Sequence, residues 1–338
     1  MTSLQHAAHL HTEGYAVVEA AAPMGTAAAR ATARAEFLAA VRTSPEFLPG
    51  AEAFVMGGFA ALANPSSFHN PFVRRLRRQA MDALLPLLRD YIRQFMPNPA
   101  EFKIEQVIDR MMLRHAGVSA TAESWHRDEA VNVLDDDVVF GGWWNLSEHD
   151  QVFIGVPRTH TAVKGHGGFA PIKLAAQKDA CDQAKQHIRI PPGAIFIFHE
   201  NMIHAVNAKP AAHDAYRVFL GWRLTASDTP IHANIRQLLA DQAVIPLKSG
   251  QVPPMYGSLH WTNWRDKIVA FTARNIRAVP GLVETRTVKS GKDAGTQVVV
   301  VVRHMPSLRF LAQAHPAVFR LFDPYTEDEI RMHLPTRY

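Results

Sequence analysis

Between residues 102 and 226 the sequence is divided into short segments rich in β-branched and aromatic residues, separated by glycine, proline or polar turns. Such segments, several in succession, are typical of the strands of a β-sandwich or barrel. They read FKIEQVIDRMML, VVFGGWWNL, QVFIGVP, HIRIPPGAIFIF and YRVFLGWRL. We therefore expect a β core over residues 102–226, in which the segment 161–187 is inserted as a loop with a short helix.

The sequence pattern of the flanking regions predicts more helix than strand. Residues 1–101 contain a short strand over 14–18 and two helices, one over about 26–41 and one from Pro71 to about Phe95. Residues 227–338 contain a helix near 235–242 and a partly helical end. The expected fold class is α+β, with an N-terminal helical segment over 1–101, a β core, and a C-terminal extension over 227–338.

Composition excludes several classes of protein. No apolar run is long enough to span a membrane, and the N-terminus has no basic patch followed by an apolar stretch, so we expect a cytoplasmic protein without a membrane partner. The single cysteine, Cys181, excludes an internal disulfide and a cysteine-based zinc site. The net charge is +5, and its densest basic run, Arg74 to Arg78, is predicted to be mostly solvated helix surface.

One short segment, Ser124 to Glu129, contains a candidate pair of metal ligands. His126 and Asp128 are two residues apart, so in extended chain their side chains point the same way and can share one metal. The expected third ligand is His204, just beyond the apolar strand GAIFIF, and His199 is its rival. Two histidines and one carboxylate are typical of non-haem Fe(II) oxygenases, in which three coordination positions stay open.

Arg217 lies thirteen residues after His204. A turn followed by a strand over 216–224 would bring its guanidinium back beside the metal, where it can bind the distal carboxylate of 2-oxoglutarate through two parallel hydrogen bonds. Arg223 is six residues further on, about 20 Å along a strand, and cannot reach the same carboxylate.

These motifs resemble those of the phytanoyl-CoA dioxygenase-like members of the Fe(II)/2-oxoglutarate oxygenase superfamily. The resemblance covers roughly residues 10–226. The matching motifs are His126-Arg-Asp128, Val156-Pro-Arg-Thr-His160, Pro192-Gly-Ala-Ile-Phe-Ile-Phe198, His204 and Arg217. The sequence departs from the family pattern at Arg158-Thr159, where a Gly-Ser pair is usual, and at Ala194, where an aspartate is usual.

The resemblance implies a double-stranded β-helix of the jelly-roll or cupin-like type. It also implies Fe(II), 2-oxoglutarate and O2 as cofactor and co-substrates, with hydroxylation of a small organic molecule and release of succinate and CO2. Further residues that it suggests for the co-substrate pocket are Gln106, Arg114, Asn145 and Thr159. Trp143 and Trp144 alternate, so one is expected in the core and one toward the site, and the segment 161–187 is a candidate lid.

Two other interpretations remain open at this point. One is a non-enzymatic cupin-like binding protein that keeps the fold without turnover. The other is an oxygenase acting on a nucleic acid or a protein side chain, which the positive charge and the aromatic residues Tyr256, Trp261 and Trp264 favour.

Overall fold

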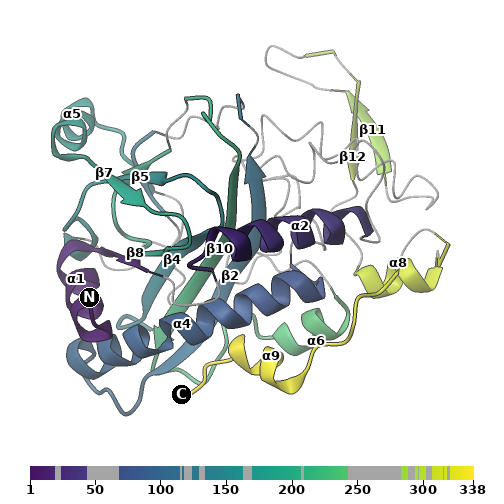
Figure 1. The fold of residues 1–338 in the computed structure, drawn as a ribbon, viewed down its shortest axis with the longest axis horizontal. Helices are drawn as coiled ribbons and strands as arrows, with labels where there is room; N and C mark the ends of the chain where they lie inside the picture. The colour runs from purple at the N-terminus through teal and green to yellow at the C-terminus, as the bar shows by residue number, and fades with distance from the viewer. Residues whose placement is uncertain are drawn as a thin grey trace.

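The computed structural model describes residues 1–19, 24–43, 68–114, 116–117, 124–128, 134–162, 170–206, 209–242, 283–287, 294–295, 297–301, 307–314, 316–317 and 320–338. Two antiparallel sheets and a layer of helices make up most of this part of the chain (Figure 1). Tyr256, Trp261 and Trp264 lie outside the described residues.

The larger sheet has five strands in the order β1-β8-β4-β10-β2. All of its pairings are antiparallel. The bounds are β1 Tyr15–Val18, β2 Lys103–Arg114, β4 Val138–Asn145, β8 Ile195–His199 and β10 Ala215–Thr225.

The smaller sheet also has five strands, in the order β6-β3-β9-β5-β7, again antiparallel. Its strands are short, and β3, β6 and β9 have two residues each. The bounds are β3 His126–Arg127, β5 Gln151–Gly155, β6 Ala170–Pro171, β7 Gln186–Ile190 and β9 His204–Ala205.

The two sheets pack face to face. Trp143 and Phe196 of the larger sheet form one apolar cluster with Phe153 and Ile188 of the smaller sheet. Trp144, the next residue along β4, points to the other side and packs in the core beneath the helices, as expected from the alternation of a strand. Two facing antiparallel sheets with this strand order form a double-stranded β-helix, and the predicted α+β fold class is confirmed.

Helices cover the outer face of the larger sheet (Figure 1). They are α1 Ser3–Glu13, α2 Ala27–Thr43 and α4 Pro71–Phe95. The longest, α4, begins with Asn70 as its N-cap and Pro71 in its first turn, and it continues through Pro86. Its apolar face, which includes Leu84 and Leu88, packs on Leu220 and Trp222 of β10 in the main core.

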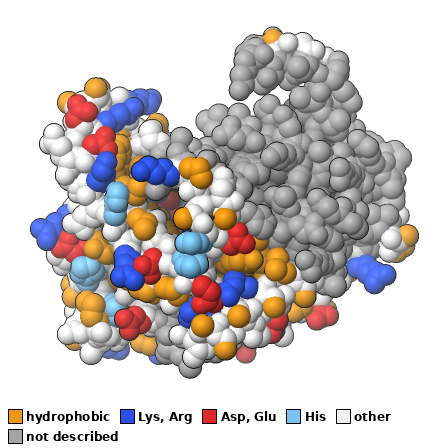
Figure 2. Space-filling view, turned by 45° about the horizontal axis from the view of Figure 1, so that its top comes forward, with side chains coloured by type: hydrophobic (Ala, Val, Ile, Leu, Met, Phe, Trp, Pro, Cys, Tyr) orange, Lys and Arg blue, Asp and Glu red, His pale blue; other side chains and the backbone are white. Residues whose placement is uncertain are grey.

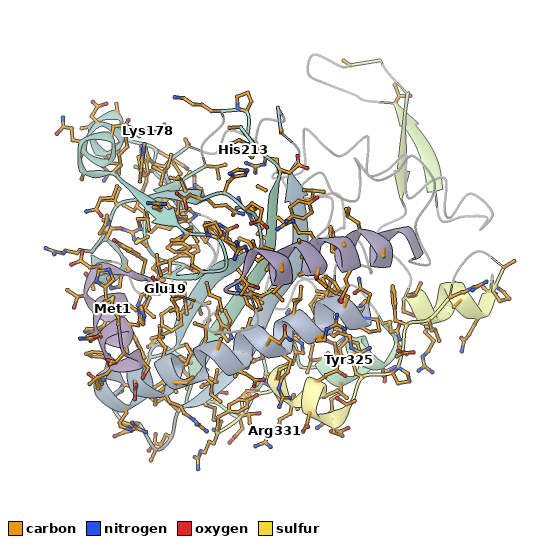
Figure 3. The ribbon with its side chains drawn as sticks, in the orientation of Figure 1. Met1, Glu19, Lys178, His213, Tyr325 and Arg331 are labelled. Atoms are coloured by element: carbon orange, nitrogen blue, oxygen red, sulfur yellow. The ribbon has the colours of Figure 1, made fainter. Side chains whose placement is uncertain are left out.

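Short elements complete the described chain. The segment after β5 holds the 3-10 helix η3 His160–Ala162 and the helix α5 Ala175–Ala184, which lies at the edge of the smaller sheet, where Figure 3 labels Lys178. The C-terminal part contains α6 Ile235–Ala240, α8 Leu308–Ala314, α9 Glu327–Met332 and a hairpin of β11 Val283–Thr287 with β12 Gln297–Val301. Among the helices described, none is both long and apolar enough to cross a membrane.

Candidate metal centre

Three side chains of the smaller sheet converge on one point. His126 of β3 lies directly opposite His204 of β9, and Asp128 follows β3 by one residue. The Nε2 atom of His126 is 3.5 Å from Asp128 Oδ1, and the Nε2 atom of His204 is 3.3 Å from Asp128 Oδ2. One ligand atom from each of the three residues lies within 4.8 Å of the others, so the predicted triad is assembled.

Both histidine rings are oriented by backbone carbonyls. His126 Nδ1 lies 2.7 Å from the carbonyl oxygen of Ser124, and His204 Nδ1 lies 2.9 Å from that of Met202. Because a carbonyl only accepts, each Nδ1 carries a proton, so Nε2 is the ring nitrogen that can bind a metal. Both Nε2 atoms face the Asp128 carboxylate.

Asp128 supplies the negative charge of this group. Burial alone would raise its pKa, but the imidazoles of His204 and His126 hold the pKa of Asp128 well below its ordinary value. The carboxylate is therefore ionised at neutral pH. An ionised carboxylate and two imidazole nitrogens on one side of a point are the ligands that a first-row divalent metal prefers, so the residues fit such an ion.

His199, the rival third ligand, belongs to a different part of the molecule. Its Nε2 is 3.2 Å from the hydroxyl of Tyr91 on α4, and its ring packs edge-on against Phe140. Burial holds the pKa of His199 well below its ordinary value. It is a core histidine beneath the helices, and it does not join the triad.

Arg217 lies on the inner face of β10, between the two sheets. Its guanidinium carbon is 4.7 Å from the centre of a Trp143 ring. Trp143 contacts Phe153 at 5.9 Å between ring centres, and Phe153 in turn stacks on the ring of His204 at 5.1 Å. An aromatic wall therefore connects the triad to the half-buried guanidinium.

Of the two pocket candidates on β2, the structure brings only Arg114 to the same face as Arg217. Arg114 is opposite Ala215, two residues before Arg217, whereas Gln106 is opposite Trp222, whose side chain is in the core under the helices. The even spacing of 106 and 114 predicts one face, but a β-bulge opposite Gly221 and Trp222 adds one residue to β2 and reverses the alternation. The Gln106 side chain thus points away from the triad.

The side chains of Asn145 and Thr159 form hydrogen bonds within the protein. Asn145 is buried opposite Arg217, donates to the carbonyls of His149 and Ile190, and accepts from the Ser147 amide and the Gln151 side chain. It therefore holds the turn after β4.

Thr159 donates to the carbonyl of Val156 at 2.7 Å and accepts from the amide of Ile203 at 2.9 Å. Ile203 directly precedes His204. The Thr159 hydroxyl therefore positions the strand that carries the third ligand.

The structure also places Trp143, Trp125, Arg223 and part of the candidate lid. Trp143 is the tryptophan that faces the interior, as described above, while Trp125 packs with Val156 and Cys181 behind the ligand strand. Arg223 forms a fully buried ion pair with Glu105 at 2.9 Å. Part of the candidate lid belongs to the sheet itself, because Ala170 and Pro171 form β6, which pairs with β3.

Sequence reasoning missed two residues beside the triad. Phe153 covers the His204 ring, and Arg127, between the first two ligands, binds two turns behind the site. The direction of the Arg127 side chain could have been predicted from the sequence. A residue between two inward-pointing side chains of a strand points to the opposite side of that strand.

The fold and the site together define a double-stranded β-helix protein with a candidate metal centre of two histidines and one carboxylate. No protein-family model and no curated protein matches this sequence.

Solved structures do match. The chain is similar to EctD from S. alaskensis with 2-oxoglutarate and 5-hydroxyectoine (16% identity, 66% of this chain and 76% of that chain, TM-score 0.45). It is similar to the epimerase SnoN in complex with Fe3+, alpha-ketoglutarate and a nogalamycin compound (15% identity, 65% and 82%, TM-score 0.44). It is also similar to AviO1 from Streptomyces viridochromogenes Tue57 (16% identity, 66% and 95%, TM-score 0.42).

Proposed function

We propose that this protein is an Fe(II)- and 2-oxoglutarate-dependent dioxygenase that hydroxylates a small organic substrate and releases succinate and CO2. The observation that carries the proposal is the oriented triad, in which two Nε2 atoms and an ionised carboxylate face one point inside a double-stranded β-helix. His126, Asp128 and His204 would hold the metal. Bound there, the iron supplies a Lewis-acidic centre with open positions for a chelating 2-oxo acid and for O2.

The chain's own residues bind and orient the co-substrate in this proposal. Arg217 presents a planar guanidinium on the inner face, suited to two parallel hydrogen bonds with the distal carboxylate of 2-oxoglutarate. Arg114 adds a second positive charge on the same face. The apolar side chains of Trp143 and Phe153 lie between Arg217 and His204. They exclude water from the side of the site on which the reaction would take place.

A small substrate is favoured over a nucleic acid by the charges of the described surface. Lys and Arg side chains are interspersed with Asp and Glu side chains over the face shown in Figure 2. Arg74 and Arg77, half of the densest basic run, are buried. A nucleic-acid site uses a basic stripe that tracks the phosphates, and the described part of this face does not present one.

The proposal is tested by anaerobic addition of Fe(II) and 2-oxoglutarate, with the weak visible charge-transfer absorption of the chelate as the signal. Wild type should develop the band, and His126→Ala and Asp128→Ala should lose it because each removes a ligand. Arg217→Ala should keep the band but need roughly 10- to 100-fold more 2-oxoglutarate, since charge-assisted hydrogen bonds contribute about 1.5–3 kcal/mol. Arg189→Met, which removes an exposed arginine on β7, is the matched control.

Succinate release in the presence of O2 then separates turnover from binding. Wild type that forms the band and releases succinate supports the enzyme. A protein that binds Fe(II) without ever developing the band with 2-oxoglutarate contradicts the proposal and favours the cupin-like binding protein.

A further inference from the structure

Arg127 lies between the metal ligands His126 and Asp128, and its side chain goes to the other side of the strand. It is buried, and one of its terminal nitrogens donates to the carbonyl of Thr159 at 2.7 Å and to the carbonyl of Asn201. Asn201 is in the turn that leads from β8 to His204. One guanidinium therefore joins the strand of two metal ligands to the turn that delivers the third.

The carbonyls that Arg127 binds belong to a connected set of hydrogen bonds. Thr159 accepts from the Ile203 amide through its hydroxyl, and the Ile203 carbonyl accepts from the amide of Val156 at 2.8 Å. The residues just before His204 are thus fixed from two sides, by Arg127 and by the Thr159 turn.

Sheet pairing alone gives the ligands little support. The described register between β3 and β9 is a single residue pair, His126 with His204, and both strands are two residues long. A long ladder would fix the separation of the two rings by itself. The amide of Asp128 adds one backbone bond to the carbonyl of Glu200 at 3.0 Å, and side chains that cross between the two segments supply further constraint.

We propose that Arg127 is a positioning residue that sets the approach of His204 to the His126–Asp128 pair, and that metal affinity depends on it. This inference rests on the metal centre of the proposed function. Its basis is the guanidinium bridge between the Thr159 and Asn201 turns, which the Arg127→Met variant would break while keeping an apolar stem of similar length. Loss of groups that orient metal ligands typically weakens metal binding 10- to 100-fold.

The experiment measures Co(II) affinity by competition with a chelator and records the visible ligand-field spectrum of the bound Co(II). Arg127→Met should weaken Co(II) binding roughly 10- to 100-fold and change the spectrum, because the third ligand is no longer held in place. Arg127→Lys keeps the charge and can reach one carbonyl at a time, so it should recover part of the affinity. Thr159→Val, which removes the hydroxyl but keeps the shape, should weaken binding in the same direction.

Arg30→Met is the matched control. Arg30 is also a buried arginine whose guanidinium donates to two carbonyls, those of Met24 and Gly25, and it is on α2, far along the chain from the triad. Its loss should lower the stability of the metal-free protein without altering Co(II) affinity or the Co(II) spectrum. Thermal unfolding of each metal-free variant separates loss of fold from loss of site geometry.

The possible outcomes distinguish failure of this inference from failure of the proposed function. Wild-type Co(II) affinity and spectrum in a folded Arg127→Met protein would overturn the inference while leaving the proposed function intact. If Arg127→Met does not fold, unchanged affinity in both Arg127→Lys and Thr159→Val overturns it instead. Wild type that binds no Co(II) would overturn the metal centre itself, and this inference with it.

Discussion

Arg158 has a backbone conformation that residues other than glycine seldom adopt, with φ at +66°. It occupies one of the two positions at which the sequence departs from the Gly-Ser turn of the family that it resembles. The exposed side chain of Arg158 binds the Glu13 carboxylate through two nitrogens, and its amide donates to the Glu13 carbonyl. The ion pair with the end of α1 offsets the strain that glycine would avoid.

This balance predicts different results for two substitutions at position 158. Arg158→Ala keeps the left-handed strain and loses the ion pair, so it should lower the free energy of unfolding. Arg158→Gly relieves the strain while losing the same pair, so it should be close to wild type. Urea unfolding of the metal-free proteins measures both, and equal destabilisation by the two variants would mean that strain plays no part.

At the scale of elements, the helix α4 holds the C-terminal segment in place. The prediction that the run Arg74 to Arg78 is mostly solvated surface was wrong for Arg74 and Arg77, which are buried. Arg74 binds Glu329 of α9 at 2.6 Å and lies over the ring of Tyr325, the residue labelled beside α6 and α9 in Figure 3. The partners are some 250 residues downstream, so no local pattern could have shown them.

The arginine run therefore contains a matched pair of test positions. Arg74→Met leaves Glu329 without its cation in a partly buried site and should destabilise the protein by roughly 3 kcal/mol. Arg75→Met removes an exposed pair with Glu36 and should change stability by less than about 1 kcal/mol. Guanidinium unfolding distinguishes the two, and similar small losses for both would contradict the docking role of Arg74.

For the whole molecule, sequence reasoning succeeded where the spacing is local. The two-residue period of a strand placed His126 with Asp128 and separated Trp143 from Trp144. It failed for Gln106, because the bulge that turns this side chain away arises from pairing with β10, a strand more than a hundred residues later. Helix α1 was not predicted, although Thr2 and Gln5 form a capping box that is a local signal.

Buried neutral histidines make the stability of the whole fold depend on pH. Burial lowers the pKa of His333 to about 3 and that of His232 to about 4. Below the ordinary histidine pKa of about 6.5 the unfolded chain binds more protons than the folded one, so stability is full above that pH and falls as the pH drops toward 3. Glu105, whose pKa burial raises to about 7, has the opposite effect. Between its ordinary pKa and pH 7 it makes the folded state more stable as the pH falls.

The contribution of His333 is isolated by comparing wild type with His333→Gln. The ring accepts from Arg77 through Nε2 and donates to the Gln106 carbonyl through Nδ1, so only the neutral form serves both partners. The free energy of unfolding of the variant should change less steeply with pH between 6.5 and 4, by at most about 1.4 kcal/mol per pH unit. Denaturant titrations with a chelator present measure this, and parallel curves would exclude His333 as a contributor.

The single pairing of His126 with His204 also bears on the order of folding. The two rings are 78 residues apart in the chain, and β4, β5, β7 and β8 all lie between them. Contacts between such distant segments form late, after the loop-closure cost of the intervening chain has been met. We therefore expect the candidate metal site to be complete only when the strands between His126 and His204 have folded.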